Sequence, residues 1–304
     1  MSGGLDSQLA VRVLQQAGAY VEAVCFSTPF FDCSAAKKAA AALDVRLHVV
    51  DFLEDEVSLL ENPPHGFGGA MNPCIDCHAL MIRRAGELMA RLGFDFVATG
   101  EVRGQRPMSQ NAQALVTVQK ASGLAGRLVR PMSAKLLEPT IPEIEGKLDR
   151  ETLLDISGRS RERQIALAKA FGIVDYPSPA GGCKLTEAAF GRKLKDLMDH
   201  EGLRQPDGSV NRTLVDLLRV GRHFRLPDGS CVILGRDCGE NAALSALNLS
   251  DAQTVSFDDV PGPTALVLAP KSEADLALAR GIVRSWSRGT SEADRAPYKP
   301  YQLT

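Results

Sequence analysis

Two hydrophobic periods alternate along the first hundred residues of the chain. Apolar residues recur at helical spacing from Gln8 to Leu14 until Gly18 stops the pattern, whereas residues 45–51 alternate between apolar and polar side chains. The first pattern is typical of a helix with one buried face and the second of a half-buried strand. The expected elements are a helix at 8–17, a strand at 20–26, a helix at 34–43, a strand at 45–51, a helix at 77–92 and a strand at 94–100.

This alternation predicts an α/β fold built on a doubly wound parallel sheet, with helices covering both faces. Ligands of such sheets bind outside the carboxyl ends of the strands. The loop at residues 2–7 and the Thr99-Gly100-Glu101 turn are both expected at that edge. We therefore predict that these two segments lie close together.

The chain changes character after a loop rich in helix breakers at residues 177–182. A helix pair is expected before this loop, between residues 150 and 172. After it we expect a helix at 187–199, a hairpin at 222–236 turning at Pro-Asp-Gly, a strand at 265–268 and a helix at 272–285. These elements predict one domain over residues 1–185, a smaller α+β domain over 205–290, and a frayed tail at 291–304.

Composition narrows the class of protein. Of the 304 residues, 44% are hydrophobic and 24% are charged, and the net charge of −2 gives no overall signal for nucleic acid or a membrane surface. No apolar run approaches the roughly 20 residues that span a bilayer. Seven cysteines in a chain without a visible secretion signal argue against a disulfide framework and favour the cytoplasm.

The sequence SGGLDS at residues 2–7 is the first candidate for a binding site. Two glycines allow a tight turn and a close backbone approach, and the start of the following helix offers unpaired N–H groups to an anion such as phosphate. The hydroxyls of Ser2 and Ser7 add donors, and Asp6 could hold Mg²⁺ against phosphates. The alternative is a plain helix cap with a glycine turn.

A phosphate loop normally follows a buried strand of about 5–6 residues. Only Met1 precedes this loop. We expect that the first strand is missing, either because the start codon is assigned too late or because the chain is truncated.

The sequence NPCIDCH at residues 72–78 is the second candidate site. Cys74 and Cys77 are spaced so that both thiols can reach one centre, and a helix N-terminus lowers the pKa of a thiol. Cys183, in the glycine-rich loop that ends the first domain, is a third candidate for the same centre.

Three thiols permit three kinds of chemistry. A 4Fe-4S cluster held by three thiolates leaves one iron open to an added ligand. A zinc ion could take His78 as its fourth ligand. A nucleophilic and a resolving thiol could instead carry a persulfide sulfur and end as a disulfide. The alternative is buried, unreactive cysteines, which is the interpretation we give to Cys25, Cys33, Cys231 and Cys238.

Basic side chains gather in three stretches, although any single one is better interpreted as part of a solvated face. The main candidates for contacts with RNA phosphates are Arg103, Arg106, Arg159, Arg161 and Arg222. The same stretches also contain Arg127, Arg130, Lys135, Arg163, Arg219, Arg225 and Arg236. Arg159 or Arg161 could instead hold nucleotide phosphates, since a guanidinium group suits bidentate contacts.

A family resemblance rests on these motifs taken together: SGGLDS, NPCIDCH, ATGEV followed by GQRPMSQ, RPMSAKLLEPT, SGRSRERQ and YPSPAGGC. With them, residues 2–186 resemble the PP-loop ATP pyrophosphatases that thiolate tRNA, the 2-thiouridylases and 4-thiouridine synthases. Residues 205–287 are similar, more weakly, to the RNA-binding module of NFACT proteins.

The resemblance implies an ATP- and Mg²⁺-dependent enzyme that adenylates a tRNA uridine, releases pyrophosphate and inserts sulfur. The sulfur would come from a cysteine desulfurase relay or sulfide. The implied ATP-binding residues are Ser2, Gly3, Gly4, Asp6, Ser7, Thr99, Gly100 and Glu101, with Asp6 as the Mg²⁺ ligand. The implied catalytic residues are Asp6, Cys74, Cys77 and Cys183.

One departure from the family pattern changes the expected cofactor. The thiouridylases space two catalytic cysteines about a hundred residues apart, whereas here the first is doubled to Cys74 and Cys77. That set is similar to the iron–sulfur branch of the tRNA thiolases and favours a 4Fe-4S cluster on Cys74, Cys77 and Cys183 over a persulfide. The rival functions are a PP-loop sulfurtransferase or ligase for a small molecule, and a nucleotide or iron–sulfur RNA-binding sensor. No membrane partner is expected, and the oligomeric state is left open, a homodimer included.

Overall fold

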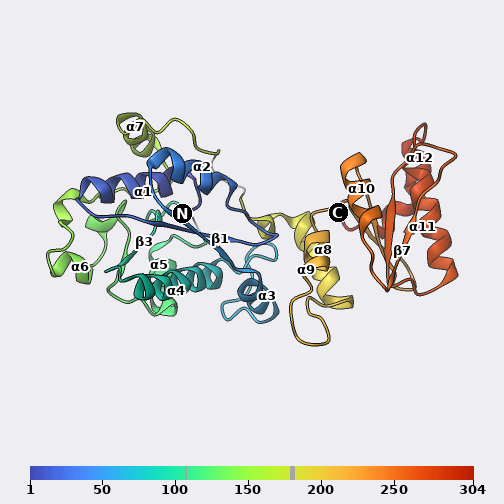
Figure 1. The fold of residues 1–304 in the computed structure, drawn as a ribbon, viewed down its shortest axis with the longest axis horizontal. Coiled ribbons are helices and arrows are strands. Elements are labelled where there is room, and N and C mark those ends of the chain that lie inside the picture. The colour runs from blue at the N-terminus through green and yellow to red at the C-terminus, as the bar shows by residue number, and fades with distance from the viewer. Residues whose placement is uncertain (107, 179–181) are drawn as a thin grey trace. The chain divides into compact units, whose positions relative to one another are not determined.

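The computed structural model describes residues 1–106, 108–178 and 182–304, so part of the GQRPMSQ and YPSPAGGC motifs lies outside the described residues. The chain divides into two compact units, Met1–Thr186 and Glu187–Thr304. Figure 1 shows the elements of both units.

The first unit alternates helices with short strands. Its elements are α1 (Leu5–Gln16), β1 (Ala23–Ser27), α2 (Ser34–Leu43), β2 (Leu47–Asp51), α3 (Leu53–Glu61), α4 (Cys74–Leu92), β3 (Val97–Ala98), α5 (Ala112–Ser122), β4 (Leu128–Val129), η1 (Ala134–Leu136), α6 (Ile141–Ile144), η2 (Arg150–Thr152), α7 (Glu162–Ala170) and η3 (Lys184–Thr186). Helices α1, α2 and α7 lie on one side of β1, and α3, α4 and α5 lie on the other (Figure 1).

The strands of this unit pair in parallel. β1 pairs with β2 from Ala23↔Leu47 to Ser27↔Asp51, and β3 pairs with β4. Within the described residues these are two separate two-stranded sheets. The mixed α/β class is therefore confirmed, whereas a single doubly wound sheet is not.

Helix α1 begins where the glycine pair ends. Gly4 is its extended N-cap, with φ −71° and ψ 164°, and Asp6 lies in the first turn, where its charge complements the helix dipole. Gly18 follows the helix at φ +83°, a left-handed conformation that suits glycine. The predicted helix at 8–17 is thus present but begins three residues earlier, at Leu5.

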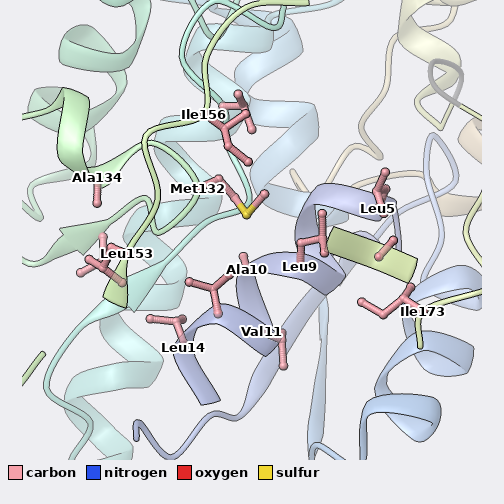
Figure 2. Close-up of a cluster of buried hydrophobic side chains, with 14 of the residues drawn as sticks. Leu5, Leu9, Ala10, Val11, Leu14, Met132, Ala134, Leu153, Ile156 and Ile173 are labelled. Atoms are coloured by element: carbon pink, nitrogen blue, oxygen red, sulfur yellow. The ribbon is translucent and has the colours of Figure 1, made fainter. Parts of the chain in front are cut away.

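The apolar face of α1 supplies much of the main core. Leu9 and Leu14 belong to a buried cluster with Met132, Ile156 and Ile173, which come from segments far along the chain. Figure 2 shows the α1 side chains facing these later segments. Fully burying a side chain of this size contributes about 1.5–3 kcal/mol. The core therefore fixes α1, and with it the glycine loop, against the rest of the unit.

Helix α4 also begins earlier than predicted, at Cys74 rather than Cys77. Its N-cap is Pro73, and it ends at Gly93, which has φ +77°. Both cysteines of the CxxC sequence therefore lie in the first turns of the helix.

A disulfide joins Cys25 of β1 to Cys33, the residue before α2. The interpretation of Cys25 and Cys33 as separate structural thiols is therefore wrong. The two Cα atoms come within 6.0 Å because the chain reverses between them at the Thr28↔Phe31 bridge. That reversal leaves no spacing signal in the sequence.

The second unit is built on an antiparallel sheet of order β5-β6-β8-β7. Its elements are α8 (Ala188–His200), α9 (Arg212–Leu217), β5 (Arg222–Arg225), β6 (Cys231–Leu234), α10 (Cys238–Ala246), β7 (Ala252–Val255), β8 (Ala265–Leu268), α11 (Glu273–Ser285), α12 (Glu292–Arg295) and η4 (Ala296–Tyr301). β5 and β6 form the predicted hairpin, whose turn places Gly229 at φ +102°.

The end of the chain is ordered, unlike the frayed tail expected at 291–304. Ser291 and Asp294 form a capping box at the start of α12. Tyr298 and Tyr301 pack against the core of the sheet, and the N–H of Leu303 donates to the carbonyl of His223 at 2.9 Å. Two partly buried tyrosine rings therefore hold the segment that was expected to be frayed.

No helix in the described part of the chain is both long enough and apolar enough to cross a membrane.

We predict that acid destabilises the second unit through His223. This side chain is buried, and its Nε2–H donates to the carbonyls of Leu217 and Val220. Burial lowers the pKa of His223 from 6.5 to about 3. The unfolded chain then binds the extra proton first, so the free energy of unfolding should fall as pH drops from about 6.5 towards 3.

Fluorescence of Trp286 can follow this unfolding, because it is the single tryptophan and packs edge-on against Phe224 at 5.3 Å. Urea titrations at several pH values should show the loss in the wild type. His223→Gln keeps a donor for the carbonyls but cannot titrate, so its pH dependence should be flatter. An equally steep dependence in this variant would contradict the assignment.

Candidate active site

The glycine loop is shaped by its contact with α2. Gly3 has φ +79°, and a Cβ built on it would lie 2.4–2.6 Å from backbone atoms of Ala35 and Ala36. Only glycine fits such a close approach. The hydroxyl of Ser7 donates to the carbonyl of Gly4 at 2.8 Å, which steadies the start of α1.

The Thr99-Gly100-Glu101 turn lies directly against this loop. A Cβ on Gly100 would lie 2.7 Å from the backbone nitrogen of Ser7 and 2.8 Å from the carbonyl carbon of Asp6. The structure therefore brings together the two segments that the sequence placed at one edge.

Asp6 has one carboxylate oxygen without a partner. Its Oδ2 accepts a hydrogen bond from Nε2 of Gln105 at 3.0 Å, whereas Oδ1 is buried and unpaired among the described residues. A buried carboxylate oxygen without a partner is costly unless a ligand satisfies it. This donor fits a Mg²⁺ ion, which prefers carboxylate oxygen.

Further unpaired polar atoms occur at the start of α7. Nε of Arg161 and both polar atoms of the Gln164 amide are buried and have no hydrogen-bond partner within the described ranges. Helix α7 packs against α1, which carries the glycine loop. These groups are therefore further candidates for contacts with a polar ligand. Gln164 ends the SGRSRERQ motif, but sequence reasoning did not single it out.

The three candidate cysteines lie near one another. Cys77 is buried and Cys74 and Cys183 are partly exposed. Burial raises the pKa of Cys77 well above its usual value, and the charges of Glu56, Cys183 and Cys74 raise it further. Burial likewise raises the pKa of Cys183 to about 12. The expectation that the helix start would lower the pKa of the thiols is thus wrong for Cys77, because desolvation dominates.

Glu56 of α3 is a site residue that sequence reasoning missed. It is fully buried, and its Oε2 accepts a hydrogen bond from the thiol of Cys77 at 3.2 Å. A signal was present: Glu56 falls on the apolar face of its helix, three residues after Leu53 and four before Leu60.

The contacts of the cysteines among the described residues give no support to a metal centre. No group of three or more His, Cys, Asp or Glu side chains in the described ranges is placed to hold a metal ion. The Cys77 sulfur carries a proton directed at Glu56, and Nδ2 of Asn72 donates to the sulfur of Cys74 at 3.2 Å. Nδ1 of His78, the expected zinc ligand, pairs instead with Glu101. Neither the expected 4Fe-4S cluster nor the zinc alternative is supported.

A buried polar network connects the Thr-Gly-Glu turn to α4. Glu101 pairs with Nε of Arg130 at 2.8 Å and Nδ1 of His78 at 3.1 Å, and it accepts from the hydroxyl of Thr99 at 3.1 Å. Burial alone would raise the pKa of Glu101, but the hydrogen bond from His78 and the charge of Arg130 outweigh it and lower this pKa to about 2. Glu101 therefore stabilises the interior of the unit through its buried partners. It also links the glycine loop to His78, the residue after Cys77.

A second histidine–carboxylate pair lies beside the cysteines. The backbone N–H of His65 donates to Oδ2 of Asp76 at 2.9 Å, and its Nδ1 pairs with Oδ1 at 2.5 Å. Asp76, which lies between the two cysteines in the sequence, is buried, whereas His65 is exposed. This pair holds the loop before α4 against the helix start.

The predicted arginine candidates divide into exposed and buried groups. Arg103, Arg106 and Arg159 are exposed, and Arg161 and Arg222 are partly buried. Two of the further basic residues, Arg130 and Arg225, are engaged with carboxylates and are not placed to contact RNA phosphates. Arg130 is buried with Glu101, and Arg225 of β5 forms ion pairs with Asp196 and Glu201 at 2.6 and 2.7 Å.

The close approach of Gly100 to the loop gives a prediction. Gly100→Ala would place a methyl group on the backbone of Asp6 and Ser7, so one of the two segments must move. We expect affinity for Mg²⁺–ATP, measured by calorimetry, to fall at least about tenfold, or about 1.4 kcal/mol. Gly69→Ala is the matched control, because a Cβ there meets no atom within 4 Å. Equal ATP affinity in the two variants would contradict this assignment.

Comparison with known proteins gives matches in both units. Residues 221–296 match the NFACT protein RNA binding domain family. The chain is 26% identical to the tRNA-specific 2-thiouridylase MnmA of Roseiflexus sp. (strain RS-1), over 75% of this chain and 66% of that protein. It is also 26% identical to MnmA of Marinobacter nauticus, over 69% of this chain and 56% of that protein.

A shorter match is 33% identical to MnmA of Sulfurimonas denitrificans, over 33% of this chain and 32% of that protein. The chain thus spans less than two thirds of the length of these relatives. The resemblance inferred from the motifs is nevertheless confirmed: the chain is similar to proteins named tRNA-specific 2-thiouridylase, and its residues 221–296 match the NFACT RNA-binding domain.

Proposed function

We propose that this protein is an ATP-dependent tRNA sulfurtransferase that adenylates a uridine carbonyl and replaces its oxygen with sulfur. The observation that carries the proposal is the Thr99–Glu101–His78 connection, which joins the glycine loop to the cysteine-bearing start of α4. Nucleotide activation and sulfur chemistry must act on the same atom of the substrate, so their residues must be held in one unit.

The glycine loop is the proposed nucleotide end. Ser2, Gly3, Gly4 and Ser7 would receive the ATP phosphates on backbone N–H groups and hydroxyls, with Thr99 and Gly100 closing the other side. Asp6 would hold Mg²⁺ through its unpaired Oδ1, and the ion would supply positive charge against the departing pyrophosphate. Arg161 and Gln164 offer further donors. Glu101 acts by positioning this turn rather than by contacting ATP.

Adenylation answers a chemical need of the reaction. A uridine carbonyl oxygen is a poor leaving group, and transfer of AMP to it creates a good one. The glycine loop lowers the barrier by binding the negative charge that builds on pyrophosphate. An anionic sulfur nucleophile then needs no further base at the uridine carbon.

The cysteines are the proposed sulfur end, and their exposure assigns their roles. Partly exposed Cys183 can meet an external persulfide donor, whereas buried Cys77 cannot. We therefore assign Cys183 as the sulfur carrier and Cys77 as the resolving thiol that forms a disulfide with it. Cys74 has no required step in this scheme.

The second unit is the proposed RNA end. Lys193, Arg222 and Arg236 lie close enough that the charges of the two arginines lower the pKa of Lys193, after the larger effect of burial. Arg236 pairs with Glu240, which leaves Arg222 as the best candidate for a tRNA phosphate. We also propose that the parallel strands of the first unit belong to one doubly wound sheet and that the protein acts in the cytoplasm. Further tRNA contacts are proposed for Arg103, Arg106 and Arg159.

The first test is the reaction itself. Purified protein, Mg²⁺–ATP, a persulfide donor and unmodified tRNA should give one thiolated uridine, AMP and pyrophosphate. Asp6→Asn should keep the fold but lose most pyrophosphate release, because it weakens the proposed magnesium ligand. Mass spectrometry of tRNA nucleosides is the readout. Pyrophosphate release that needs no tRNA, with unmodified nucleosides, would favour a small-molecule substrate instead.

The second test compares the cysteines. Cys183→Ser and Cys77→Ser should abolish thiolation while leaving adenylation intact, whereas Cys74→Ser should keep most activity. Cys238→Ser is a control, because this exposed residue lies in the second unit. Loss of activity in Cys74→Ser, together with brown, iron-containing wild-type protein purified without oxygen, would contradict the persulfide scheme.

A further inference from the structure

Glu56 is an acidic residue on the buried, otherwise apolar face of helix α3. It lies on α3 between Leu53, Val57 and Leu60, all of them buried, and has an exposed fraction of 0%. An unpaired ionised carboxylate is among the costliest groups to bury. A role for Glu56 in packing alone therefore does not explain its presence.

The contacts of Glu56 point to Cys77. Oε2 accepts the hydrogen bond from the Cys77 thiol at 3.2 Å, whereas Oε1 is buried with no partner in the described part of the chain. One carboxylate oxygen, Oε2, therefore faces the thiol proton, and the other, Oε1, has no partner among the described residues.

The surroundings of Glu56 and Cys77 favour a proton that can move between these two side chains. Burial raises the pKa of Glu56 to about 7, an effect that Asp55 on α3 increases and that Cys77 and His78 on α4 reduce. The pKa of Cys77 is raised by burial and by the charges of Glu56, Cys183 and Cys74. At neutral pH the proton therefore stays on sulfur while the carboxylate is poised to take it.

We propose that Glu56 is the proton acceptor that activates Cys77 as the resolving thiol. The inference rests on the proposed function only for the identity of the sulfur acceptor, because the step itself involves cysteine sulfur alone. No motif of the sequence marks Glu56, and it reaches Cys77 from a different helix.

The Cys77 S–H bond breaks and its proton moves to Glu56. The resulting thiolate attacks the Cys183 sulfur of a Cys183–S–SH persulfide, which forms the Cys77–Cys183 bond and breaks the bond to the terminal sulfur. Hydrosulfide leaves. The terminal sulfur is reduced and the two cysteines are oxidised, and a dithiol reductant restores them after each turnover.

A buried thiol needs such a partner because water cannot take its proton. Desolvation disfavours the free thiolate, and a carboxylate at hydrogen-bond distance lets charge move only between two adjacent groups. The charge then forms at the moment of attack rather than in the resting protein.

The test uses the whole protein without tRNA or ATP. Cys183 is charged with inorganic polysulfide in the absence of oxygen, and hydrosulfide release and the Cys77–Cys183 disulfide are followed by mass spectrometry against pH. The wild-type rate should rise through about pH 7, as Glu56 loses its proton. In Glu56→Gln the rate at pH 7.5 should fall about 100-fold and rise only at alkaline pH.

A second readout separates this role from a structural one. Glutamine removes a negative charge beside Cys77, so the Cys77 thiol should ionise at a lower pH in Glu56→Gln than in the wild type, as followed by the ultraviolet absorbance of its thiolate. Easier ionisation with slower transfer is expected only if Glu56 takes the proton. Asp55→Asn is the matched control on the same helix and should keep the wild-type rate, with its rise shifted only towards lower pH, because the charge of Asp55 raises the pKa of Glu56.

Three results would overturn the inference: a wild-type pH profile in Glu56→Gln, the same loss in Asp55→Asn, or an iron–sulfur centre on the three cysteines of protein purified without oxygen. If Glu56→Gln does not fold, Glu56→Asp decides: a slower rate that still rises near neutral pH supports the proposal, and loss of that rise refutes it. A failure of tRNA thiolation would leave this assay readable, so the two proposals can fail separately.

Discussion

The first unit depends on one buried ion pair, between Glu101 and Arg130. Both side chains are almost fully buried, so each would carry a desolvation cost of several kcal/mol if left alone. Arg130 satisfies its other donors with the side chain of Gln119 and the carbonyl of Leu115, and Glu101 takes a further hydrogen bond from His78. Because no partner can leave without stranding a charge, the turn at Gly100, helix α5 and the start of α4 keep a fixed relation.

That fixed relation carries into the site. The Thr99-Gly100-Glu101 turn touches the glycine loop through Gly100 and touches α4 through His78. The loop is in turn fixed by Gly3 against α2 and by the apolar face of α1 in the main core. A shift of any one of these elements would change the separation between the proposed nucleotide end and the proposed sulfur end. The geometry of the site therefore depends on packing well away from either end.

Sequence reasoning located the parts of this site that depend on local chemistry. A glycine pair before a helix, a CxxC sequence at a helix start and a Thr-Gly-Glu turn after a strand each have a short-range cause, and all three occur where expected. It could not find what depends on long-range contact. Glu56 meets Cys77 from 21 positions away, Arg130 meets Glu101 from 29, and the Cys25–Cys33 disulfide follows from a chain reversal. The helix at 53–61 was missed as well, and with it the position of Glu56.

The two ends of the site differ in the charge that they present, and this difference suits the tasks proposed for them. The glycine loop offers donors and an incompletely satisfied carboxylate, an environment that gains most from a bound cation and phosphates. The proposed sulfur end instead places one acid, Glu56, against the buried Cys77 thiol. Thiols kept protonated in this way resist oxidation and do not react until a proton acceptor is used. The proposed reaction, which forms an activated substrate, would gain from this arrangement, because the nucleophile would form only when sulfur is ready to move.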